Sequence, residues 1–231
     1  MTRIAAGLVA AALVLTACDP LELAAPSTPP PAPPAQPPPA NAAALLGKLV
    51  VAEEDTGAHY KREHWGEGWS EDRNGCSTRE LVLLEQARAA EPGRNCAPDC
   101  PSADQSCWVS PYDGRPTGDA RDLEIDHRVS LKEASRSRVV QAGGKPGLGA
   151  ARLWSPERKH AFYEDRSNLV AVTSQVNQSK SDDDAGDWRP AQRAAWCDFA
   201  TRYAQTKVKY GLTVDRAEHA GLAQMLGTCP K

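Results

Sequence analysis

The sequence predicts an α+β domain in which a small ββα unit is embedded in a mainly helical, disulfide-containing body. Residues 122–127 alternate between apolar and polar side chains, which is typical of a strand with one buried face. Residues 168–173 are apolar and β-branched, as in a buried strand, and a short helical segment follows them directly. Six cysteines follow residue 41 and favour disulfide bonds in the same domain.

A signal peptide is predicted at residues 1–17. Arg3 precedes an apolar run at 4–15, which is shorter than the roughly 20 residues needed to span a bilayer. The stretch from Leu15 to Cys18 resembles a bacterial lipobox, and this resemblance implies cleavage before Cys18 and lipidation of its thiol. The alternative is plain secretion, in which Cys18 has no special role.

The predicted lipidated cysteine and a proline-rich linker together occupy residues 18–40. Residues 26–40 contain so many prolines that they favour an extended polyproline II spacer and exclude a packed core. The folded domain is therefore expected at residues 41–231, a length that fits one domain.

The charge of the chain does not by itself indicate a nucleic-acid-binding protein. The formal net charge is −3, so any such role must depend on a local basic patch. One candidate patch lies between His127 and Arg166, where nine lysines and arginines accompany four acidic residues. The alternative interpretation is an ordinary solvated surface.

The cysteines of the domain indicate up to three disulfide bonds, because their number is even and the chain is predicted to be exported. Cys197 and Cys229 form the favoured pair, since both lie in the C-terminal helical region. A zinc site formed by Cys96, Cys100 and Cys107 is the alternative. It is disfavoured because the paired close spacing of structural zinc ligands is absent.

Capping and chain-breaking residues predict the other elements. Ser77 with Glu80, and Ser130 with Glu133, have the spacing of a capping box, so each pair predicts a helix start. Pro156 suits the first turn of a further helix. The expected elements are a helix or strand at 43–51, a helix from 77 to about 90, a helix after 130, a flexible break at 143–149, and helices from 155, at 190–210 and at 215–226.

Polar residues with the chemistry of a catalytic site lie at the ends of the two predicted strands. Asp126 and His127 end the first strand, and Asn168 opens the second. Asn177 and Lys180 lie on the helix that follows. An isolated Asp-His pair is more often a surface ion pair, and an asparagine at a strand start is more often a turn residue. Their combination on one ββα unit predicts a single site.

These positions resemble the HNH nuclease motif of the ββα-metal superfamily. More closely, the domain is similar to exported bacterial HNH endonuclease family proteins related to the C-terminal nuclease domain of GmrSD restriction enzymes. The family often has proline where this chain has Ser130 and tryptophan where it has Ser135. The resemblance depends on the stretches "YKREHWGEGW", "GCSTRELVL", "YDG", "EIDHRVSL", "NLVAVTSQVNQSK" and "WRP".

The resemblance implies a metal-dependent endonuclease with a ββα-metal core. His127 is expected to be the general base, because a neutral imidazole near pH 7 can accept a proton from water. Asn168 is expected to complete the catalytic site by bracing the loop and orienting the base. Asp126 and Asn177 are the expected metal ligands, and their oxygen atoms favour Mg²⁺ or Mn²⁺ over Zn²⁺.

Three basic residues are expected to bind the phosphate of the substrate: Lys180 first, with Arg62 and Arg79 as weaker candidates. Glu124 is an alternative metal ligand, because it lies two residues before Asp126 on the same strand face.

The predicted function is therefore hydrolysis of phosphodiester bonds in nucleic acid outside the cytoplasm, with DNA favoured over RNA as the substrate. The protein is expected to be a lipoprotein anchored through Cys18 on the outer face of the bacterial plasma membrane, or to be secreted. No obligate protein partner is evident. The alternatives are a non-catalytic nucleic-acid-binding surface lipoprotein and a metal phosphodiesterase that acts on a smaller substrate.

Overall fold

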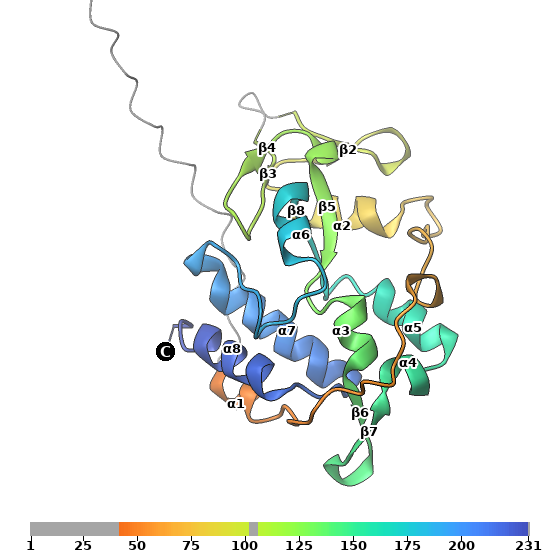
Figure 1. Ribbon diagram of the computed structural model, residues 1–231. Coiled ribbons are helices and arrows are strands. Elements are labelled where there is room, and N and C mark those ends of the chain that lie inside the picture. The colour runs from red at the N-terminus through yellow and green to blue at the C-terminus, as the bar shows by residue number, and fades with distance from the viewer. Residues whose placement is uncertain (1–41, 102–105, 231) are drawn as a thin grey trace, which may run out of the picture.

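The computed structural model describes residues 42–101 and 106–230. The predicted signal peptide at 1–17, the lipidation site Cys18 and the linker at 18–40 lie outside the described residues. Within the described ranges the chain folds into eight α-helices, short 3₁₀ turns and four two-stranded sheets (Figure 1). The predicted α+β class with disulfide bonds is therefore confirmed.

The two predicted strands pair with each other. β5 (Leu123–His127) and β8 (Leu169–Thr173) run antiparallel, with Leu123 opposite Thr173 and His127 opposite Leu169. The helix α6 (Ser174–Lys180) begins immediately after β8. The chain thus forms two antiparallel strands followed by a helix (Figure 1).

The side chains of β5 alternate between two different environments, as the strand period requires. Leu123 and Ile125 belong to a small apolar cluster with Leu83 of the helix α2 (Thr78–Gln86). Glu124 and Asp126 instead make hydrogen bonds with side chains of α6. The small sheet therefore has an apolar face toward α2 and a polar face toward α6.

The larger hydrophobic core lies among the C-terminal helices. α7 (Trp196–Tyr210) and α8 (Arg216–Leu226) pack against each other and against α1 (Ala42–Leu46) (Figure 1). The long helix was expected to start near residue 190. It starts at Trp196, because the three residues before it form a 3₁₀ turn, Arg193–Ala195.

The connections between these two parts are short helices and hairpins. α3 (Leu131–Arg136) follows β5, and α4 (Ala150–Leu153) and α5 (Pro156–Tyr163) precede β8. The expected flexible break at 143–149 is a projecting hairpin of β6 (Arg138–Val140) and β7 (Pro146–Gly149) (Figure 1). The remaining strands form two hairpins between residues 91 and 117, the cysteine-rich segment that contains Cys96, Cys100 and Cys107. These hairpins are β1 (Glu91–Pro92) with β2 (Pro98–Asp99), and β3 (Trp108–Val109) with β4 (Pro116–Thr117).

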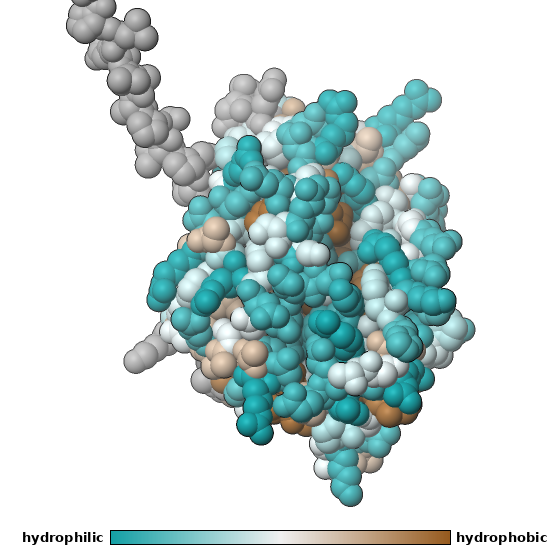
Figure 2. Space-filling model, in the orientation of Figure 1, coloured by the Kyte–Doolittle hydropathy of each residue, from teal (hydrophilic) through white to brown (hydrophobic). Residues whose placement is uncertain are grey.

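On the face shown in Figure 2, hydrophilic residues dominate the surface and hydrophobic ones form small separate patches.

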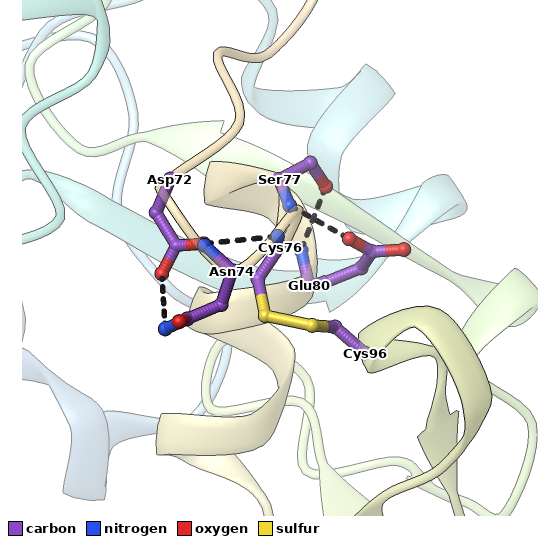
Figure 3. The surroundings of a disulfide bond; sticks show 6 residues. All are labelled: Asp72, Asn74, Cys76, Ser77, Glu80 and Cys96. Atoms are coloured by element: carbon purple, nitrogen blue, oxygen red, sulfur yellow. Dashed lines mark hydrogen bonds between the residues drawn. A yellow bond between two sulfur atoms is a disulfide. The ribbon is translucent and has the colours of Figure 1, made fainter.

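The start of α2 is fixed by a capping box and a disulfide bond (Figure 3). Ser77 accepts a hydrogen bond from the Glu80 amide, and the Glu80 side chain accepts one from the Ser77 amide, as predicted. The neighbouring Cys76 is bonded to Cys96. The helix ends at Gln86, four residues earlier than expected.

All six cysteines of the domain form disulfide bonds. Cys197 pairs with Cys229, as predicted, and Cys76 pairs with Cys96. Cys100 pairs with Cys107. The alternative of a zinc site is wrong, because each of its three expected thiolate ligands is consumed by a disulfide.

A buried ionic network joins α3 to the C-terminal helices. The Lys207 ammonium lies 2.6 Å from a carboxylate oxygen of Glu133 and 2.7 Å from one of Glu218. Ser130 caps α3 as predicted, but the Glu133 side chain does not complete the capping box. Its carboxylate turns instead to the buried ammonium, because an unpaired buried charge would be costly.

Glu54 lies beside this network. Its carboxylate is 3.1 Å from Arg136. Burial raises the pKa of Glu54 to about 7, and the hydrogen bond and negative charge of Glu133 act in the same direction, as does the charge of Asp184. Glu54 therefore binds a proton more tightly in the folded chain than in the unfolded chain.

Replacing both Cys197 and Cys229 with alanine should lower the free energy of unfolding by roughly 4 kcal/mol. The bond closes a loop with a sequence separation of 32 residues, and the stabilisation grows with loop length. Replacing Cys100 and Cys107, with a separation of 7, should cost only about 2 kcal/mol. Denaturant unfolding of both double variants tests this, and equal losses would contradict it.

Glu54→Gln should flatten the pH dependence of stability. Because the folded pKa is raised, the contribution of Glu54 is complete below its unfolded pKa of 4.5 and is lost as pH rises through about 7. The unfolding free energy of the native protein should therefore fall, relative to that of Glu54→Gln, between pH 4.5 and 7. The exposed neighbour Glu53 provides the control, Glu53→Gln, which should leave the native pH profile unchanged.

Candidate functional site

His127 ends β5 with its imidazole buried. Nε2 lies 2.9 Å from the carbonyl oxygen of Tyr163 and donates its hydrogen there, which leaves the lone pair on Nδ1. Burial lowers the pKa of His127 to about 3, and the charges of Lys180 and Arg62 lower it as well. The ring is therefore neutral at physiological pH.

The Nδ1 atom of His127 is available to an incoming group. It has no hydrogen-bond partner among the described residues, and it is not one of their buried polar side-chain atoms that lack a partner. Trp69 and Tyr163 lie beside the ring, with ring centroids 5.8 and 5.3 Å away. His127 thus has a fixed tautomer and an unused acceptor nitrogen.

Asn168 holds the chain that leaves His127. Its side chain accepts a hydrogen bond from the Val129 amide at 2.9 Å and donates one to the Val129 carbonyl at 3.1 Å. Its own carbonyl accepts from the amide of Arg128. Asn168 is fully buried and positions the loop after His127 through the backbone, in keeping with the bracing role expected of it.

Asp126 lies on the opposite face of β5 and has both carboxylate oxygens engaged. One accepts from the Lys180 ammonium at 2.9 Å, and the other accepts from the Tyr112 hydroxyl at 3.0 Å. Burial raises the pKa of Asp126, while Lys180 and Tyr112 act against that rise. Asp126 was expected to be a metal ligand, but this arrangement leaves it no free oxygen among the described contacts.

Lys180 was expected to bind a phosphate, and the structure corrects this. Its side chain is fully buried and donates to Asp126 and to the His127 carbonyl, 2.9 Å away. The last turn of α6 directs the ammonium inward, where a carboxylate and a carbonyl replace its water. Lys180 is therefore a structural link between α6 and the end of β5.

Glu124 and Asn177 form the exposed part of the same face. The Asn177 amide nitrogen donates to a Glu124 carboxylate oxygen at 2.6 Å, and both residues are partly exposed. Among the described residues, the side-chain oxygen (Oδ1) of Asn177 and the second carboxylate oxygen of Glu124 accept no hydrogen bond. Two hard oxygen donors with water access fit Mg²⁺ or Mn²⁺, which typically use one or two protein carboxylates and retain water.

The two arginines expected to contact phosphate have different surroundings. Arg79 donates to the carbonyl oxygens of Ala120 and Leu123, at 2.9 and 2.8 Å, so it supports the backbone before β5 and is not placed to bind phosphate. Arg62 is exposed, and its guanidinium lies 5.8 Å from the ring centroid of Tyr163, next to His127. Arg62 remains available to a phosphate.

A second acidic group was not predicted from the sequence. Ligand atoms of Glu54, Asp184 and Asp215 lie within 4.8 Å of one another, and in residues 42–101 and 106–230 this is the one group of three acidic, histidine or cysteine side chains so arranged. The three residues come from separate segments, so no spacing in the sequence indicated their meeting. They adjoin the Lys207 network and include none of the predicted site residues.

The described fold and site define an α+β protein with three disulfide bonds, which are typical of exported proteins. The chain is 34% identical over 190 residues to an uncharacterized secreted protein of the fungus Arthroderma benhamiae, covering 81% of this chain and 84% of the relative. The chain belongs to the family of that secreted protein. No family model and no solved structure matches the chain.

These comparisons correct the identification of the chain as an exported bacterial HNH endonuclease family protein. The relative is fungal, and no comparison connects the chain to an HNH family. The secreted relative and the three disulfide bonds support export from the cytoplasm. None of the helices in the described ranges is long and apolar enough to cross a membrane.

Lys180→Met should destabilise the protein by about 3–5 kcal/mol, because it leaves the buried Asp126 carboxylate without its cation. Adding Asp126→Asn should recover part of that loss. Lys132 pairs with Asp182 at 3.4 Å on the surface, so the matched Lys132→Met should cost less than about 1 kcal/mol. Urea unfolding measures all three variants, and a small loss for Lys180→Met alone would contradict the structural role of this pair.

Proposed function

We propose that this protein is an exported, divalent-cation-dependent phosphodiesterase that cleaves nucleic acid, with DNA favoured over RNA. One observation supports it above the others. A neutral histidine with a free Nδ1 and a pair of partly exposed oxygen donors lie on one small ββα unit, connected through Lys180. Lys180 belongs to the same helix as Asn177 and bonds to the carbonyl of His127.

His127 acts as the general base in this proposal. Phosphodiester hydrolysis requires a water molecule to lose a proton as it attacks phosphorus. Nδ1 accepts that proton, while the hydrogen on Nε2 remains bonded to the Tyr163 carbonyl and keeps the ring oriented. Asn168 contributes by fixing the backbone immediately after His127.

Glu124 and Asn177 would hold the cation. Each has a side-chain oxygen that accepts no hydrogen bond from the described residues, and water and a substrate phosphate oxygen would complete the shell. A bound Mg²⁺ or Mn²⁺ supplies positive charge to the phosphate and the leaving oxygen. Asp126 instead holds Lys180 and Tyr112, so Glu124 takes the role that the sequence assigned to Asp126.

Export is the broader part of the proposal. Lipidation of Cys18 and attachment to a membrane are a narrower form that depends only on the stretch from Leu15 to Cys18. Determining the mass of the mature N-terminus distinguishes a diacylated cysteine from a plainly cleaved chain.

His127→Ala should lower the cleavage rate by about 10²–10⁴-fold, because the water loses its base, and should leave Mn²⁺ affinity nearly unchanged. The assay follows plasmid and oligonucleotide substrates with Mg²⁺, with Mn²⁺ and with EDTA. His219→Ala on α8 is the matched control and should cleave normally. Absence of metal-dependent cleavage by the native protein would contradict the proposed function.

Glu124→Gln and Asn177→Ala should each weaken Mn²⁺ binding in calorimetric titration, whereas Asp126→Asn should not. The reason is that, of these three residues, Glu124 and Asn177 each have a side-chain oxygen without a hydrogen bond to the described residues, whereas both oxygens of Asp126 are engaged. The opposite pattern, loss of binding in Asp126→Asn with Glu124→Gln unaffected, would restore Asp126 as the ligand.

A further inference from the structure

The ring of Trp69 lies next to the proposed base in a near-parallel orientation. Its centroid is 5.8 Å from that of His127, with 21° between the ring planes, and 4.7 Å from that of Tyr163, with 22° between the planes. Tyr163 is buried, but Trp69 is only partly buried. Part of the Trp69 side chain therefore remains accessible, with its ring centroid 5.8 Å from that of His127.

The chain around Trp69 holds this ring in place. The Ser70 amide donates to a Glu164 carboxylate oxygen at 3.0 Å, and the Ser70 hydroxyl lies 3.1 Å from Nε2 of His160. Upstream, Gly66 lies so close to Tyr163 that a Cβ at this position would collide with the tyrosine ring. Trp69 is thus fixed by its neighbours before any ligand arrives, which reduces the entropy lost on binding.

The exposed edge of Trp69 differs from those of the other two partly buried tryptophans. The indole of Trp188 donates to the Ser179 hydroxyl, and that of Trp196 donates to the Pro190 carbonyl. Among the described residues, the indole nitrogen of Trp69 has no such partner and is not a buried atom lacking one. The ring of Trp69 therefore packs beside Tyr163 and His127, and its partly exposed remainder, including the indole nitrogen, is available to a ligand.

We propose that Trp69, with Arg62 at the neighbouring Tyr163 ring, forms a stacking site for one unpaired base next to the scissile phosphate, so that the substrate is single-stranded nucleic acid. This inference rests on the proposed phosphodiesterase function. Arg62 is exposed beside Tyr163 and can contact the phosphate of the stacked nucleotide. A base within a duplex is already stacked on its neighbours, so it would have to be unstacked before it could reach Trp69.

Binding to an eight-residue oligodeoxythymidylate, measured by fluorescence anisotropy in EDTA, tests the site without requiring cleavage. Trp69→Leu should weaken this binding by roughly 5- to 100-fold, which corresponds to one base stack, and Trp69→Phe should weaken it less. Binding to a hairpin duplex of equal length should not change. Trp196→Leu is the matched control and should not affect either ligand.

Kinetics provide the second measurement. Trp69→Phe should raise KM for the single strand more than it lowers kcat, because stacking binds the substrate without touching the reacting atoms. Melting temperatures of each variant identify any that fail to fold, and Trp69→Phe is the decisive variant if Trp69→Leu does not fold. Equal weakening of single-strand and duplex binding, or no weakening, overturns the proposal. If binding depends on Trp69 but the protein cleaves none of the substrates, the phosphodiesterase function is refuted and the base-binding site remains supported.

Discussion

The ion pair between Lys180 and Asp126 determines how the rest of the site is arranged. Both groups are buried, so neither can be left unpaired without a large loss of stability. The same ammonium also binds the carbonyl of His127, and this contact sets the end of β5 against the last turn of α6. Asn177 lies one helical turn before Lys180, so fixing the last turn of α6 also places the Asn177 side chain against Glu124.

A sheet of two strands is not stable by itself, so the neighbours of β5 and β8 maintain the site from the other side. α2 covers the apolar face, and its Gln86 side chain bonds to the backbone of both Leu169 and Ala171. Arg79 of the same helix bonds to the backbone at the start of β5. The disulfide at Cys76 and the capping box fix the start of α2, so the cysteine-rich segment contributes to the geometry of the sheet.

The polar interior has two separate parts with different chemistry. Around Lys207, the carboxylates of Glu133 and Glu218 share one ammonium. Burial raises the pKa of Glu218 to about 8 and that of the nearby Glu54 to about 7, whereas at Glu133 burial is outweighed by the charge and hydrogen bonds of its neighbours, Lys207 first, which lower its pKa. Around Asp126, one carboxylate is matched by one ammonium and one hydroxyl, and no such excess of negative charge exists. The first network joins the helices, whereas the second supports the candidate site, so changes of pH near neutrality should act mainly on the first.

Local signals in the sequence determined the two strands, the capping box at Ser77 and the starts of α2, α3, α5 and α8, because capping and alternation depend on residues only a few positions apart. They also predicted the pairing of Cys197 with Cys229, since Cys197 lies in α7 and Cys229 follows the end of α8, the helix that packs against α7. They did not give the start of α7, which lies at Trp196 and not near residue 190. The period of β5 placed Glu124 and Asp126 on one face. The strand period does not indicate which of the two carboxylates pairs with Lys180, because their partners Asn177 and Lys180 lie 53 and 54 residues away in the sequence. Tertiary packing made that choice: it buried Lys180 against Asp126, directed Arg79 to the backbone and left Glu124 and Trp69 accessible to a ligand.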